Sequence, residues 1–144
     1  MKFIFSLLTL VCSASAFGQN DQRHLLNFDG YYQTECYIEK GDDAGSQDYL
    51  RFYISGKVID VGTDCKGTAN ELKEWFNINA DQVGRGDYKT KGGKLFFSTK
   101  SKTGIIDYKG RIKKNGLIKI KWKSRINGSR GHDKYKFIPI ASMT

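Results

Sequence analysis

The chain has 144 residues, of which 24 are lysine or arginine and 15 are aspartate or glutamate, so its formal net charge at pH 7 is +9. This length predicts one domain with a genuine hydrophobic core and excludes an array of several domains. The basic excess favours anionic partners or surfaces but identifies none.

The chain begins with the pattern of a secretory signal peptide. Met1-Lys2 supplies a positive start, residues 3–11 form an apolar run, and small residues follow up to the Ala14-Ser15-Ala16 triplet. The apolar run is too short to span a bilayer, which distinguishes a cleaved leader from a membrane anchor. We therefore expect residues 1–18 to be a signal peptide, although a buried N-terminal strand is an alternative interpretation.

A cleaved leader predicts an exported protein, in the periplasm or the extracellular medium, whose residues 19–144 form the single domain. Cys12 raises the alternative of a lipoprotein. Lipid attachment needs a small residue just before the cysteine, and Val11 occupies that position, so the lipoprotein interpretation is disfavoured. The mature chain has no candidate transmembrane segment and is expected to be a monomer.

Alternation of apolar and polar residues with a period of two dominates the rest of the sequence and predicts short strands separated by turn residues. The expected strands cover residues 31–39, 50–54, 58–61, 86–90, 95–98, 106–112, 117–126 and 135–138. Turns rich in glycine, asparagine or aspartate separate them, and Asn115-Gly116 is a typical hairpin turn. Pro139, the only proline, stands where the last strand can end.

One segment between the third and fourth strands has a helical pattern. Thr68 and Glu71 have the spacing of a capping box, in which the two side chains satisfy backbone donors at the start of a helix. Leu72, Trp75 and Phe76 then fall on one apolar stripe over about two turns. The sequence predicts a short helix that packs on another element.

Eight sequential antiparallel strands predict an all-β fold, an up-and-down β-barrel, because closure removes the unpaired strand edges. A sandwich of two sheets is the alternative. In a barrel the helix leaves and re-enters the same rim, so we expect it to lie across the open end as a lid.

Cys36 and Cys65 are the two cysteines that remain after cleavage of the leader, and export favours a disulfide between them. Both fall near the same rim of the predicted barrel. Strands one and three are two spacings apart, so the bond requires the chain to bend after Val61, which Gly62 and Gly67 permit. Two unpaired buried thiols are the alternative.

Residues 49–137 carry an ordered set of motifs: R-F-Y…G-x-V, W-F, G-x-Y, F-S-T, G-x-x-D-Y-x-G, S-x-I-N-G and Y-x-F. In this spacing the chain resembles a family of small exported bacterial proteins of unassigned function, and in architecture it is similar to lipocalin-like, or calycin-type, barrels. The resemblance implies the barrel fold but no activity. The G-x-W motif of true lipocalins has no counterpart, since Gly30-Tyr31-Tyr32 carries tyrosine instead, so lipocalin ligand residues are not transferred.

An eight-stranded barrel is just wide enough to fill with side chains or to enclose one small ligand. The alternation turns eight aromatic residues inward, namely Tyr32, Phe52, Tyr88, Phe97, Tyr108, Trp122, Tyr135 and Phe137. Buried tyrosine hydroxyls need partners, which a ligand, a trapped water or the rim would supply. The candidate ligand-binding residues, inside the barrel or under the helix, are Tyr108, Trp122, Tyr135, Trp75 and Phe76. A fully packed core is the alternative.

The last three strands place a basic row on the opposite, outward face, where Asp107 and Asp133 are the only acidic residues expected. The row comprises Lys109, Arg111, Lys119, Lys121, Lys123 and Arg125, and Lys113, Lys134 and Lys136 extend it. Like charges on adjacent strands cost stability, which hints at an anionic partner. Lysines also discourage aggregation, which needs no partner. Nucleic acid is an unlikely partner because the leader exports the chain.

No catalytic or metal-binding motif occurs in the sequence. The histidines His24 and His132 lack metal-ligand spacing, and the aspartates are scattered over different segments. We expect no cofactor, no metal site and no enzymatic activity. The favoured hypothesis is an exported barrel that binds a small, partly apolar molecule. The alternatives are a binder of anionic polymers or surfaces and a protein-interaction module, such as a hydrolase inhibitor or an immunity-type protein.

For the interaction module, the relevant residues lie in the loop before the last strand and beside it. They are Arg125, Asn127, Arg130 and His132.

Overall fold

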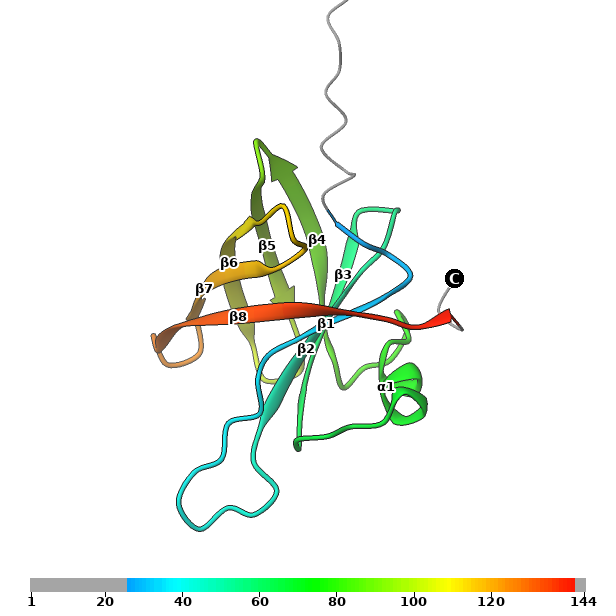
Figure 1. Cartoon of the computed structure of the whole chain (residues 1–144). Coiled ribbons are helices and arrows are strands. Elements are labelled where there is room, and N and C mark those ends of the chain that lie inside the picture. The colour runs from blue at the N-terminus through cyan, green and yellow to red at the C-terminus, as the bar shows by residue number, and fades with distance from the viewer. Residues whose placement is uncertain (1–25, 142–144) are drawn as a thin grey trace, which may run out of the picture.

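The computed structural model describes residues 26–141, which form a closed antiparallel barrel (Figure 1). The elements in chain order are β1 (Gly30–Gln33), β2 (Gln47–Phe52), β3 (Lys57–Thr63), α1 (Ala69–Trp75), β4 (Gly84–Lys91), β5 (Lys94–Lys100), β6 (Ile105–Ile112), β7 (Ile118–Ser124) and β8 (Arg130–Pro139). Each strand pairs with the next, and β8 returns to pair with β1. The predicted eight-stranded up-and-down barrel, with one helix between the third and fourth strands, is confirmed.

The predicted signal peptide, Cys12 and His24 lie outside the described residues. Within residues 26–141, no helix combines the length and the apolar character that a membrane span requires.

The alternation of the strands fills the barrel with aromatic and aliphatic side chains. Phe52 is the centre of the aromatic contacts, because its ring meets the rings of Tyr88 and Phe97 edge to face, with centroids 5.1 and 5.6 Å apart. Ile118 and Ile120, which alternate with the lysines of β7, are fully buried. All eight aromatic residues predicted to face inward belong to this cluster or pack against it.

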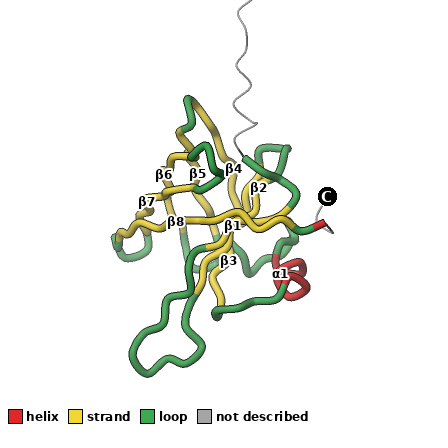
Figure 2. Tube along the Cα trace, viewed as in Figure 1, coloured by secondary structure: helices red, strands yellow, loops and turns green. Residues whose placement is uncertain are grey.

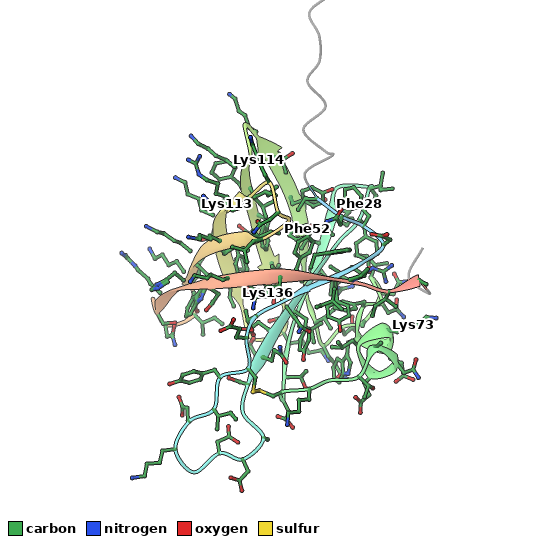
Figure 3. The ribbon with its side chains drawn as sticks, in the orientation of Figure 1. Phe28, Phe52, Lys73, Lys113, Lys114 and Lys136 are labelled. Atoms are coloured by element: carbon green, nitrogen blue, oxygen red, sulfur yellow. A yellow bond between two sulfur atoms is a disulfide. The ribbon has the colours of Figure 1, made fainter. Side chains whose placement is uncertain are left out.

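The segment before β1 closes one end of the barrel. Leu26 is buried in the core cluster, and Phe28 packs against the same cluster from the barrel end where the described chain begins; Phe28 and Phe52 are labelled there in Figure 3. The backbone N–H of Asn27 donates a hydrogen bond of 2.8 Å to the hydroxyl of Tyr32, which fixes this segment to the first strand. This half of the interior is therefore packed and covered.

The helix packs against the outside of the barrel, beside β1, β2 and β3, and so the expectation of a lid was wrong (Figure 2). The predicted capping box is present, with Thr68 and Glu71 each accepting from the other's backbone N–H. Leu72 and Phe76 are buried in a second cluster with Tyr49 and Ile59, which point outward from β2 and β3. Both faces of these strands are thus covered.

A disulfide joins Cys36 and Cys65, whose Cα atoms are 5.4 Å apart. It connects the loop after β1 to the loop between β3 and α1. The chain does not bend directly after Val61, because β3 continues through Gly62 to Thr63 and stays paired with β2, so the turn toward Cys65 comes later than expected. The first strand is shorter than predicted and ends at Gln33. Beyond it the chain leaves the sheet toward the disulfide, and only an isolated bridge at Tyr37 continues the pairing.

Candidate ligand cavity

The half of the barrel opposite the covered end contains a cavity of about 340 Å³ that opens to solvent. Its walls come from the strand ends that meet at this rim: Asp48 from β2, Asp60 from β3, Thr99 from β5 and Ile106 from β6, together with residues of β7, β8 and the helix. The interior is therefore packed in one half and hollow in the other.

Four of the five candidate ligand-binding residues line this cavity. Tyr108, Trp122 and Tyr135 project into it from β6, β7 and β8, as expected from alternation. Trp75, at the end of α1, reaches the mouth and is 39% exposed. Four of the aromatic residues selected from the sequence therefore lie around the same cavity.

Phe76 does not line the cavity. Its side chain is 3% exposed and packs beside Tyr31 in the outer cluster, with the ring centroids 5.7 Å apart. The hydroxyl of Tyr53 donates a hydrogen bond of 2.6 Å to the Phe76 carbonyl. The expectation failed because the helix covers the side wall of the barrel rather than its end, so adjacent helix residues face different surroundings.

Three aspartates, which the sequence analysis did not select, also line the cavity: Asp48, Asp60 and Asp133. Asp133 was expected on the outer face but lies on the inward face, two residues before Tyr135. The signal was available, since each aspartate is two positions from an inward apolar residue on its own strand. Alternation assigns them to the interior, whereas a search for catalytic spacing passes over them.

Two of the aspartates are held by neighbouring side chains. The carboxylate of Asp60 accepts hydrogen bonds from the hydroxyl of Tyr108 and from that of Thr99, the latter at 3.2 Å. The indole N–H of Trp122 donates to Oδ2 of Asp133 at 2.6 Å. These bonds fix the orientation of two wall aromatics, while no ion pair with a basic residue neutralises either carboxylate within the described part of the chain.

Asp48 has a different environment. Its carboxylate reaches solvent through the mouth but accepts no hydrogen bond from any described residue. Burial by the surrounding strands, and then repulsion from Asp60 and Asp133, raise its pKa from 3.8 to about 6. Burial also raises the pKa of Asp60, against the opposing effect of its bonds to Tyr108 and Thr99. The cavity therefore brings three carboxyl groups together, and burial and mutual repulsion disfavour the charged form of Asp48.

Glycines opposite two of these aspartates leave space in the wall. Gly62 is the cross-strand partner of Asp48, and a Cβ added there would lie 3.0 Å from Asp48 Oδ1. Gly84 is the partner of Asp60, and its Cβ would lie 3.2 Å from the Asp60 Cβ. Any larger side chain at these positions would occupy the hollow half of the barrel.

The outer surface of β6, β7 and β8 carries the predicted basic row. Lys109 pairs across the strands with Lys121, and Arg111 pairs with Lys119. Lys119 in turn faces Lys134 on β8. Figure 3 shows labelled Lys113 and Lys114 at the turn that joins β6 and β7, where they project away from the barrel. Like charges thus oppose each other over adjacent strands.

Two members of the extended row are neutralised. Lys136 forms an ion pair of 2.9 Å with Glu35. Arg125 forms a two-pronged ion pair with Asp107, with N–O distances of 2.7 and 2.8 Å. Its guanidinium, by hydrogen bonding, is the main reason that the pKa of Asp107 lies below its usual value. Among the described residues, Arg111, Lys119, Lys121 and Lys123 have no such acidic partner. The unbalanced part of the surface is therefore centred on β7.

No group of three or more histidine, cysteine, aspartate or glutamate side chains in residues 26–141 is arranged to hold a metal ion. The comparison with models of known protein families gives no match, and the search of curated proteins finds none that is significantly similar.

Proposed function

We propose that the chain is an exported, non-catalytic β-barrel that binds a small, partly apolar molecule in the open half of its interior. The observation that carries the proposal is the cavity of about 340 Å³ lined by Trp75, Tyr108, Trp122 and Tyr135. Its volume is within the range of small-molecule sites, about 300–1,000 Å³, and a few polar groups converge between its apolar walls, as such sites require.

Export is supported by the leader pattern and by the disulfide between Cys36 and Cys65, since such bonds persist mainly in oxidising compartments. A monomeric state is supported by the closure of the sheet, because β8 pairs with β1 and the described strands leave no long edge for pairing between copies.

Native mass spectrometry of protein purified from its own host tests the proposal. A bound small molecule should be released from the wild-type protein, and Gly62→Leu should abolish it because the new side chain would enter the cavity. Thr63→Leu is the control, since it places the same leucine side chain on the outer side of the same strand. An unchanged ligand load in Gly62→Leu would exclude the cavity as the binding site.

The basic face supports a second candidate function, the binding of an anionic polymer. The specific observation is the cross-strand pairing of Lys109 with Lys121 and of Arg111 with Lys119, since like charges placed opposite each other destabilise a sheet. A polyanion would offset this repulsion.

Retention on an anionic polymer matrix tests this candidate and should fall steeply as salt is added. Replacing Lys119, Lys121 and Lys123 by glutamine should lower the salt concentration needed for elution. A control that replaces Lys40, Lys66 and Lys73 removes the same charge from other surfaces. Equal elution of the two triple variants would show that net charge alone, and not this face, governs retention.

A further inference from the structure

The interior and the exterior of the barrel carry opposite charge. All three charged residues that line the cavity are acidic, and no lysine, arginine or histidine of the described chain lines it. The outer wall over the same strands is basic, with Lys119, Lys121 and Lys123 alternating with the inward residues of β7. A protein of net positive charge therefore encloses a negative interior.

The cavity also contains an unsatisfied polar group that is separate from the carboxylates. Tyr135 is only 2% exposed and lines the cavity, and its hydroxyl has no hydrogen-bond partner among the described residues. Burial, and then the charges of Asp48 and Asp60, raise the pKa of this hydroxyl above its usual value. A hydroxyl that lines a cavity without a protein partner has bonding capacity left over, so it marks a position for a bound polar atom.

The unmet bonding capacity defines the chemistry of a ligand. The carboxylate of Asp48 is exposed at the mouth and accepts no hydrogen bond from the described residues, so it can accept donors from a ligand and favours a positive charge there. The hydroxyl of Tyr135, on the wall of the same cavity, can accept or donate a further hydrogen bond. A metal ion is disfavoured because no suitable group of three ligands is present in residues 26–141. The walls formed by Trp75, Trp122 and Ile106 would instead cover an apolar body, and indole faces attract cations.

We propose, on the basis of the binding function above, that the cavity takes a small organic cation: a primary amine whose ammonium group lies between Asp48 and Tyr135 and whose apolar body packs against Trp75 and Trp122. Asp60 and Asp133, each held by side chains of the wall, supply further negative potential. The ligand class is thus set by the aspartates, and the ligand shape by the aromatic walls.

Isothermal titration calorimetry at pH 7.5 with three probes of similar shape tests this inference. The probes are 2-phenylethylamine, the neutral 2-phenylethanol and the anionic 3-phenylpropanoate. We expect the amine to bind at least about tenfold more tightly than the alcohol, because hydrogen bonds to charged groups are the stronger ones, and the carboxylate not to bind.

Two variants locate the binding. Asp48→Asn keeps the shape of the side chain, removes its charge and relieves repulsion, so it should fold; amine affinity should fall by about tenfold or more while the affinity of the alcohol stays the same. Asp43→Asn, in the exposed loop before β2, is the charge-matched control and should change nothing. Tyr135→Phe should weaken amine binding by roughly threefold to tenfold through loss of one hydrogen bond.

The outcomes separate this inference from the proposed function. Equal binding of the amine and the alcohol, unaffected by Asp48→Asn but abolished by Gly62→Leu, would overturn the cationic ligand and leave the cavity as a binding site. Failure of all three probes to bind, together with the absence of a co-purified molecule, would overturn both.

Discussion

The two halves of the barrel interior are built from the same strands but contain opposite chemistry. In the covered half, Phe52, Val58 and Leu95 are at most 1% exposed and pack in the hydrophobic core cluster. In the open half, the same strands supply Asp48, Asp60 and Thr99. The comparison indicates that the two ends of each strand have different roles. One end stabilises the fold, and the other carries polar groups that destabilise it.

The largest effect should come from the covered half. Phe52→Ala removes a ring that meets those of Tyr32, Tyr88 and Phe97, and should lower the free energy of unfolding by about 3–5 kcal/mol. Ile106→Ala, in the wall of the open half, should cost clearly less because solvent already reaches that part of the interior. Chemical denaturation measures both. Equal losses would contradict the division between the halves.

The next effect concerns the rim of the open half. The disulfide closes a loop between cysteines 29 positions apart, and its removal by Cys36→Ser with Cys65→Ser should lower the free energy of unfolding by about 3–4 kcal/mol on the chain-entropy treatment. The measurement is again chemical denaturation, with the wild-type protein under reducing conditions as the second arm. A loss well below 1 kcal/mol in both would show that the rim is held by packing alone.

The smallest effect is the pH dependence due to Asp48. Because its folded-state pKa is about 6 and its ordinary value is 3.8, the folded protein binds the proton more tightly than the unfolded chain over this range. Its contribution to stability is therefore present below about pH 4 and is lost as the pH rises through about 6. The neighbours responsible are Asp60 and Asp133, in addition to burial.

The difference in unfolding free energy between the wild-type protein and Asp48→Asn, measured from pH 3.5 to 7.5, isolates this group. The free energy of unfolding of the variant should increase relative to that of the wild type as the pH rises. The difference should level off above the folded-state pKa of Asp48. A difference that is independent of pH would contradict the raised pKa. Asp43→Asn, the same substitution in the exposed loop before β2, is measured in parallel as the control.

The alternation rule was sufficient to predict the barrel and the inward aromatics, because strand faces are fixed by a period of two. It placed Tyr108, Trp122 and Tyr135 on the inward face but left open whether the interior is hollow or packed. Applied to the acidic residues as well, it would have found Asp48 and Asp60. Catalytic spacing along the sequence does not reveal these aspartates, because a cavity collects residues from separate strands.

The position of the helix could not be predicted from its own apolar stripe, which shows that it packs but not where. The relevant signal lay in β2 and β3, where Tyr49 and Leu50, and likewise Val58 and Ile59, are consecutive buried residues. Strands that are apolar on both faces must be covered on both. That pattern identifies the outer wall as the surface that the helix covers and explains the misplacement of Phe76.

The opposed charges across the wall of β7 have a kinetic consequence for any cationic ligand. Lys119, Lys121 and Lys123 repel such a molecule from the flank of the barrel, whereas the three aspartates line the cavity that opens beside Trp75. The lysines then act as a shield that confines productive encounters to a single direction of approach. Added salt would screen the repulsion and the attraction together, so its two effects on the capture rate would oppose each other.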